Sequence, residues 1–150
     1  HVAAYNGYLD SFLIIIQLLC QKGEDNKIVE EFLEQRLNEP DNAGYAPIHL
    51  ATCNEYVSYV RTLAACSQVN INLKEKRSGN TALHMAILAN NVELTQLLIE
   101  LGEADVSIKN NNNESCEVLR KRAGIEVAKT GSFRRRVSRT LKLFNLPRLQ

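Results

Sequence analysis

The stretch Gly79-Asn80-Thr81-Ala82-Leu83-His84-Met85-Ala86 decides the fold, because its pattern also occurs earlier, as Gly44-Tyr45-Ala46-Pro47-Ile48-His49-Leu50-Ala51. Gly, His and Ala recur between the two stretches at an offset of 35 residues. The start of the chain, His1-Val2-Ala3, carries the His-x-Ala core again, and Asn113-Glu114-Ser115-Cys116 is a weaker copy. A recurring pattern with this period indicates a chain built from stacked structural units.

The repeated positions have physical reasons. Gly44 and Gly79 stand where a hairpin would turn, a place that favours glycine because a positive φ carries no Cβ penalty. Thr81 can cap a helix through its hydroxyl, and Pro47 suits a first helical turn, where a missing N–H is no loss. A second helix, ended by Gly102 in a left-handed conformation, is predicted from an apolar face. That face consists of Val92, Leu94, Leu97, Leu98 and Leu101.

The period and the sequence Gly-x-Thr-Ala-Leu-His resemble the ankyrin repeat, which has about 33 residues and a Thr-Pro-Leu-His-x-Ala signature. The resemblance implies an all-α ankyrin-repeat solenoid of about three to four helix-turn-helix pairs joined by β-hairpin loops. We expect the repeat domain to cover residues 1–123. Its parts would be repeats at about 1–40 (with a helical insertion), 41–75 and 76–109, a polar capping half-repeat at 110–123, and then a basic amphipathic tail at 124–150.

The first unit contains two helical segments after a predicted break at Asn6-Gly7. One is strongly apolar, from Leu9 to Cys20, and the other is amphipathic, from Lys27 to Leu37. The sequence leaves open which of the two is the regular outer helix. In the last unit, residues 116–123 are too polar to be packed on both sides, which is typical of a terminal repeat.

No residue pattern indicates catalysis. The three histidines, His1, His49 and His84, occupy one position in successive units and would be too far apart to share a metal. We expect them to bond backbone groups of the adjacent hairpin. Gly-rich phosphate loops, nucleophile motifs and metalloprotease motifs are absent from the sequence. The prediction is therefore a protein that is not an enzyme and has no metal, catalytic residue or cofactor.

The cysteines and the apolar runs bear on the compartment. Cys20, Cys53, Cys66 and Cys116 form no Cys-x-x-Cys pair, and we expect buried free thiols in a reducing compartment. The longest apolar run, Phe12–Cys20, is far shorter than the roughly 20 residues of a membrane-spanning helix, so no transmembrane segment is predicted.

Charge divides the chain into two parts. Residues 129–150 hold seven basic and no acidic residues, whereas the preceding part holds eleven basic and all seventeen acidic residues, a net charge of −6. Phe133, Val137, Leu141 and Phe144 would share one helical face of this tail. Its predicted functional bases are Arg134, Arg135, Arg136, Arg139 and Lys142.

Several interpretations of the tail stay open. It is compatible with a nuclear-import or nucleic-acid contact, a membrane-surface or calmodulin-type helix, or a kinase substrate with Ser138 as the phosphate acceptor. It is equally compatible with a terminal helix docked on the acidic repeats, or with a disordered basic end.

A narrower resemblance is carried by residues 70–84, where a lengthened hairpin precedes Gly79-Asn80-Thr81-Ala82-Leu83-His84, and by an insertion at residues 19–40. These features resemble the I-kappa-B family and the C-terminal half of NF-kappa-B precursors. The resemblance implies a cytoplasmic or nuclear inhibitor that binds Rel-homology (NF-kappa-B) dimers and blocks DNA binding or nuclear entry. The chain has no Asp-Ser-Gly tripeptide, the family's phosphodegron. This would suit a constitutive inhibitor such as a viral mimic, but residues upstream of this sequence could equally carry the tripeptide. Alternatives are a generic ankyrin adaptor and a tail-driven association with nucleic acid or membrane.

Ankyrin geometry implies that a partner contacts the hairpin tips and the concave surface of the inner helices. The residues predicted to do so are Tyr5, Asn6, Asn42, Tyr45, Cys53, Asn54, Arg77, Asn80, Asn112 and Glu114.

Overall fold

The computed structural model describes residues 27–101 and 103–127. The predictions for Gly102, for everything before Lys27 (Tyr5, Asn6 and the Leu9–Cys20 helix included) and for the tail lie outside these residues. The described part contains no strand. Its helices are α3 (Lys27–Asn38), α4 (Pro47–Cys53), α5 (Val57–Ala65), α6 (Ala82–Leu88), α7 (Val92–Glu100) and α8 (Cys116–Ala123). The predicted all-α ankyrin solenoid is confirmed.

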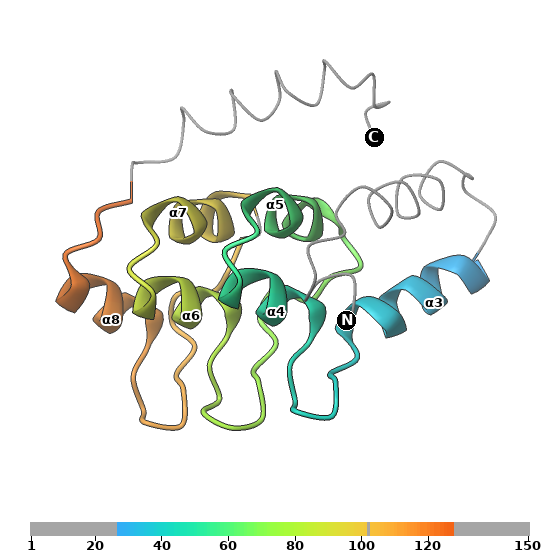
Figure 1. Cartoon of the computed structure of the whole chain (residues 1–150), viewed down its shortest axis with the longest axis horizontal. Coiled ribbons are helices and arrows are strands. Elements are labelled where there is room, and N and C mark those ends of the chain that lie inside the picture. Colours follow the sequence, from blue (N-terminus) through green and yellow to red (C-terminus); the bar gives the residue numbers. More distant parts are fainter. Residues whose placement is uncertain (1–26, 102, 128–150) are drawn as a thin grey trace, which may run out of the picture.

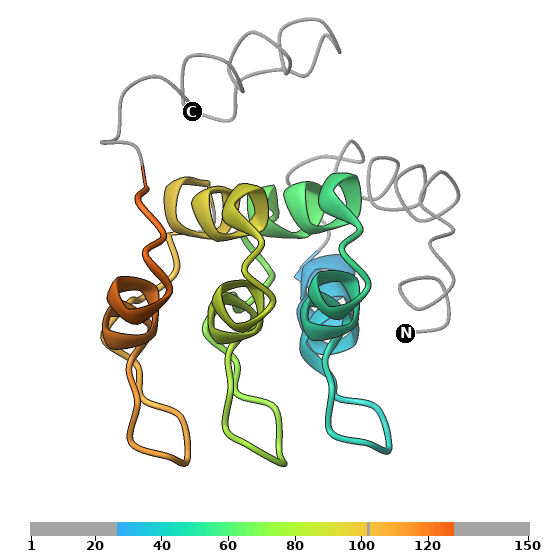
Figure 2. The ribbon, with the colours of Figure 1, turned by 60° about the vertical axis from the view of Figure 1, so that its left-hand side comes forward.

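The helices lie in two rows. The short inner helices α4, α6 and α8 pack side by side, and the outer helices α5 and α7 pack on each other in a second row (Figure 1). A hairpin loop precedes each of α4, α6 and α8, and these three hairpins project in the same direction from the inner row (Figure 2). The solenoid therefore has an edge of hairpins, an inner-helix surface and an outer-helix surface.

Local sequence explains where the helices begin and end. The Thr81 hydroxyl and the Ser115 hydroxyl each accept a hydrogen bond from a backbone amide of the helix that follows, which satisfies one of the free N–H groups there. Proline is the first residue of α4, as predicted. The sharp breaks between inner and outer helices are made by Glu55 and Asn90, with φ of 57° and 55°. Because asparagine tolerates the left-handed region, Asn90 suits such a break.

The core is aliphatic. Ile48 and Leu83 are buried between the rows, and Ala51 and Ala86 are fully buried where a larger side chain would separate neighbouring helices. The apolar face predicted for α7 is largely confirmed, because Leu94, Leu97 and Leu98 are fully buried. Val92 is a correction, since its side chain is 46% exposed. Two residues advance a helix by about 200°, so Val92 points away from the face that contains Leu94.

Helix α3 belongs to the inner row. It packs against α4, at the height of the inner helices (Figures 1 and 2). Its last residue, Asn38, fastens it to the next repeat: the amide nitrogen donates to the carbonyl oxygen of Gln68, and the amide oxygen accepts from the backbone of Asn70, both at 2.7 Å. The segment from Lys27 therefore does not occupy the place of an outer helix, which resolves part of the ambiguity that the sequence left.

Candidate functional site

The first and third hairpins are closed from within by a short polar side chain. Asp41 accepts hydrogen bonds from the backbone amides of Ala43 and Tyr45, both at 2.9 Å. The side-chain oxygen of Asn110 does the same for Asn112 and Glu114, both at 3.0 Å. Since asparagine and aspartate hold turns through such bonds, the tips of these two hairpins have fixed backbones.

The middle hairpin is one residue longer, and a longer side chain holds it. Glu75 is only 2% exposed. Its carboxylate accepts from the backbone amides of Arg77 and Ser78 at 2.6 Å and of Asn80 at 3.0 Å. Burial alone would raise the pKa of Glu75, but these three hydrogen bonds to the ionised form outweigh burial and lower it. Glu75 is thus an ionised carboxylate whose charge is used to shape the hairpin.

Neighbouring hairpins are bonded to one another. The backbone amide of Asn111 donates to the carbonyl oxygen of Ser78 at 2.9 Å, and its side-chain amide donates to that of Arg77 at 3.2 Å. On the other side, the Lys76 side chain lies so close to Gly44 that a Cβ there would meet it at 2.7 Å. The three hairpins therefore form one continuous edge.

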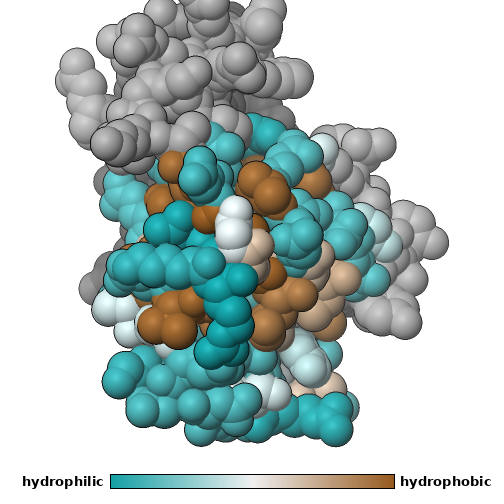
Figure 3. Space-filling view, turned by 90° about the vertical axis from the view of Figure 1, so that its left-hand side faces the viewer, coloured by the Kyte–Doolittle hydropathy of each residue, from teal (hydrophilic) through white to brown (hydrophobic). Residues whose placement is uncertain are grey.

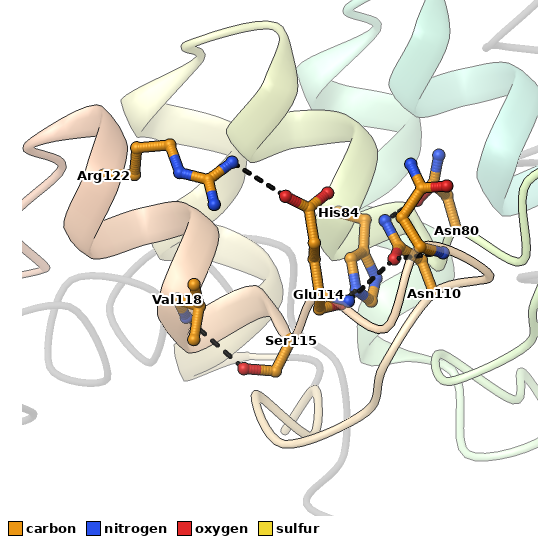
Figure 4. Close-up of polar contacts among 8 residues, drawn as sticks. Asn80, His84, Asn110, Glu114, Ser115, Val118 and Arg122 are labelled. Carbon is orange, nitrogen blue, oxygen red and sulfur yellow. Dashed lines mark hydrogen bonds and ion pairs between the residues drawn. The ribbon is translucent and has the colours of Figure 1, made fainter.

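His49 and His84 fasten α4 and α6 to the hairpin that follows each of them, as predicted, whereas His1 lies outside the described residues. His49 Nδ1 accepts from the backbone amide of Ala46 at 3.1 Å, so its proton lies on Nε2, which donates to the carbonyl oxygen of Leu73 at 2.9 Å. His84 makes the equivalent bonds, and Nε2 lies 3.1 Å from the carbonyl oxygen of Glu114 (Figure 4). Burial lowers the pKa of both rings.

One buried group superficially looks catalytic. Cys116 Sγ lies 3.1 Å from His84 Nδ1, and Thr81 Oγ1 lies 2.9 Å from the same nitrogen. All three side chains are buried, and burial raises the pKa of Cys116 to about 11, the opposite of an activated thiolate. Within residues 27–101 and 103–127, no three His, Cys, Asp or Glu side chains are grouped to hold a metal. The group is structural.

The cysteines require a partial correction. Cys53, Cys66 and Cys116 form no disulfide, as predicted, but only Cys116 is buried. Cys53 is exposed, because it is the last residue of α4 and faces the inner-helix surface rather than the outer row. Cys20 lies outside the described residues.

The inner-helix surface has an apolar centre. Cys53 Sγ lies 3.6 Å from Met85 Sδ, which joins the exposed surfaces of α4 and α6. Leu88, 35 residues after Cys53 and at the same position of its repeat, is 58% exposed. Sequence reasoning selected Cys53 and Asn54 but missed Met85 and Leu88, although the repeat offset applied to Cys53 identifies Leu88.

The predicted partner-binding residues that the structure describes fall into three groups. Asn42, Arg77 and Asn112 are exposed at the hairpin tips, and Cys53 and Asn54 are exposed at the end of α4. The third group is partly buried, and each of its members directly precedes the N-cap residue of an inner helix. It consists of Tyr45, Asn80 and Glu114.

Two members of that last group already have polar side-chain partners. Asn80 Oδ1 accepts from Asn110 at 3.0 Å, and a Glu114 carboxylate oxygen lies 2.7 Å from an Arg122 guanidinium nitrogen (Figure 4). Asn80 and Glu114 would therefore contribute to a binding surface mainly by holding the hairpins and α8 in place, rather than by contacting a partner themselves.

The α8 end of the stack differs from the other repeats. Val118 occupies the helix position that His49 and His84 hold, and it is 50% exposed because no described hairpin follows to cover it. Figure 3 shows this end, where hydrophobic groups lie among hydrophilic ones. None of the described helices is both long and apolar enough to cross a membrane.

Comparison with known proteins agrees with this architecture. The family described as "Ankyrin repeats (3 copies)" matches residues 1–110. The BTB/POZ domain-containing protein 1 of Schizosaccharomyces pombe is 30% identical over 101 residues, which cover 62% of this chain and 8% of that protein. The NF-kappa-B p105 subunit of Gallus gallus is 31% identical over 97 residues, which cover 61% of this chain and 10% of that protein.

A third relative is the I-Kappa-B like protein C2 of Microplitis demolitor bracovirus, 27% identical over 104 residues, which cover 64% of this chain and 58% of that protein. The aligned residues span about a tenth of the length of the first two relatives. The predicted I-kappa-B-like resemblance is confirmed by these likenesses, and the repeats make the molecule a protein-binding module. The chain belongs to the ankyrin-repeat family.

Proposed function

We propose that this chain is an I-kappa-B-like inhibitor that binds a Rel-homology (NF-kappa-B) dimer and blocks its DNA binding or its entry into the nucleus. The observation that carries the proposal is the likeness to an NF-kappa-B p105 subunit and to an I-kappa-B-like protein. On this proposal the chain acts in the cytoplasm, the nucleus or both, and needs no cofactor.

The binding surface would combine two parts. The exposed tips at Asn42, Arg77 and Asn112 supply polar contacts on backbones that are already fixed, which reduces the entropy lost on binding. The inner-helix surface around Cys53 and Leu88 supplies the apolar centre that a stable interface needs. A partner that covers both would bury about 800 Å² on this side, the size of an ordinary specific interface.

The experiment is a competition between the purified full chain and DNA. A Rel-homology dimer is bound to a fluorescent duplex that carries its recognition site, and displacement is followed by anisotropy. We expect Leu88→Asp to weaken displacement about tenfold or more, since it places a charge at the centre of the surface. Val92→Asp is the matched control, because Val92 is also exposed but lies on α7, and we expect it to change displacement less than about twofold.

Either of two results would contradict this proposal. One is that the wild-type chain neither binds the dimer at low salt nor displaces DNA. The other is that Leu88→Asp and Val92→Asp weaken binding equally, which would place the contact away from the inner helices.

A generic ankyrin adaptor is the second candidate, and the likeness to a BTB/POZ domain-containing protein favours it at a similar level of identity. Such an adaptor would bind its partner without changing Rel-dependent transcription. Affinity capture with mass spectrometry, run beside a Rel-dependent reporter, separates the two functions. A parallel capture with residues 129–150 deleted shows whether any partner depends on the basic tail.

A further inference from the structure

The basic side chains of the described repeats fall into two groups: those that lie beside a carboxylate and those that do not. Four basic side chains lie beside a carboxylate oxygen, at 2.7 to 3.9 Å: Arg36, Arg61, Lys121 and Arg122. Arg120 donates to the carbonyl oxygen of Ile125. Among the described Lys and Arg side chains, those with no carboxylate partner and no such hydrogen bond are Lys74, Lys76, Arg77 and Lys109.

All four of these side chains belong to the hairpin edge. Lys76 and Arg77 lie at the tip of the middle hairpin, and Lys74 and Lys109 stand at the equivalent base positions of the middle hairpin and the next one. Each is exposed. We call these four residues the basic edge, and Figure 2 shows the two hairpins that carry it lying side by side.

The nearby carboxylates do not neutralise the basic edge. Glu75 stands between two of its members, but its carboxylate is buried and turned inward to three backbone amides. Asp41 of the first hairpin is likewise bonded to backbone amides. The acidic side chains therefore hold the loops in shape while the basic ones face solvent.

The basic edge is also pre-organised. The carbonyl oxygens of Arg77 and Ser78 are held by Asn111, and the stem of Lys76 lies against Gly44. A ligand that binds charges on fixed loops loses less conformational entropy than one that must order them first.

We propose that the basic edge binds an acidic peptide segment of a protein partner. This binding goes beyond the inhibition of a Rel dimer and does not depend on it. Nucleic acid fits less well, because residues 27–101 and 103–127 comprise fourteen acidic and ten basic residues, Lys27 included, a net charge of −4. A duplex carries one negative charge per about 1.7 Å and would be repelled by that excess beyond the small basic edge. A short acidic peptide can contact the basic edge without reaching the acidic surface around it.

The test uses the full chain with all seven Lys and Arg of residues 129–150 replaced by Gln, so that the tail cannot bind the probe. The probe is a fluorescein-labelled oligoglutamate peptide, followed by anisotropy, with a Gly-Ser peptide as the neutral control. In this background the double variant Lys76→Glu and Arg77→Glu should weaken peptide binding about tenfold. Glutamate retains the Cβ, Cγ and Cδ atoms with which Lys76 lies against Gly44.

The matched control is Lys121→Glu with Arg122→Glu, the same change of two adjacent charges on α8, where both cations are already paired. This control should bind the peptide within about twofold of the background. The proposal is overturned if the peptide does not bind, if both double variants lose binding equally, or if single-stranded DNA binds the background more tightly than the peptide does. Circular dichroism of every variant shows that the fold is retained.

Discussion

His84 Nε2 donates a hydrogen bond to the carbonyl oxygen of Glu114 across 3.1 Å and thereby joins α6 to the hairpin of the following repeat. His49 makes the equivalent bond to Leu73 one repeat earlier. Since ankyrin repeats are stabilised mainly by contacts between neighbours, these two rings add to the apolar packing and to the hydrogen bonds between hairpins that already join the units.

Replacing His84 by Ala should lower the free energy of unfolding by about 2–4 kcal/mol. The substitution leaves the backbone amide of Thr81 and the carbonyl oxygen of Glu114 without their partner and opens a cavity beside Cys116. Urea unfolding followed by circular dichroism measures the loss. Val118→Ala is the control at the aligned position and should cost less than about 1 kcal/mol, because Val118 is half exposed. Equal losses would show that the interrepeat bond adds nothing.

The same histidines predict a loss of stability in mild acid. Burial lowers the pKa of His49 and His84 in the folded chain, whereas in the unfolded chain both titrate near 6.5. Below that pH the unfolded state binds more protons, so the free energy of unfolding falls as pH falls toward the folded pKa values. The urea midpoint should therefore be lower at pH 5.5 than at pH 7.5. His84→Gln should make this pH dependence shallower, and an unchanged slope would argue against a neutral, buried His84.

Because the middle hairpin is longer than the other two, we expect that only a side chain as long as Glu75 can reach all three of its backbone amides. Aspartate performs the same task at position 41, but there the hairpin is one residue shorter. Glu75→Asp should therefore cost about 1–3 kcal/mol, because the shorter carboxylate cannot reach all three amides. Deleting Arg77 in the Glu75→Asp background shortens the hairpin to match and should restore part of the lost stability. If the deletion lowers the urea midpoint further, the matching of side chain to loop length is wrong.

Local sequence predicted the parts of this fold that depend on local physics. The turn at Gly44, the cap at Thr81 and the first helical turn at Pro47 follow from the backbone preferences of single residues, so the sequence predicts all three. Tertiary contacts decided what the sequence could not. The place of α3 in the inner row depends on packing against α4, and the role of Glu75 depends on a closed six-residue loop.

The candidate site shows the same division. The alignment of the repeats identified exposed positions such as Asn54 and Arg77. Applied to Cys53, the offset of one repeat also identifies Leu88. Register does not show which charges are neutralised, because the partners of Lys121 and Arg122 are known only once the chain is folded. The basic edge therefore emerged from the structure alone.

Two glycines with the same backbone conformation should respond differently to substitution by alanine. Gly79 and Gly124 both have φ of 66°. A Cβ on Gly79 would collide with the Asn111 side chain and lie 3.1 Å from its backbone nitrogen, whereas a Cβ on Gly124 meets nothing within 4 Å. Gly124→Ala should cost about 1 kcal/mol from the left-handed backbone alone, and Gly79→Ala about 1–3 kcal/mol more. Equal urea midpoints for the two variants would show that Asn111 and its hairpin can move away from the added Cβ without lowering the free energy of unfolding.

Cysteine labelling can test the inner-helix surface in the native protein. Burial raises the pKa of both thiols, that of Cys116 to about 11, but Cys53 is exposed and Cys116 is buried. A maleimide should therefore modify Cys53 in the native protein and Cys116 only in urea. Mass spectrometry of the digested peptides distinguishes the sites. A bound Rel-homology dimer should slow the labelling of Cys53 about tenfold, because it covers the end of α4. Cys66, which follows α5 on the other side of the repeat, is the internal control and should keep its rate. Protection of Cys66 without protection of Cys53 would place the partner on the outer helices instead.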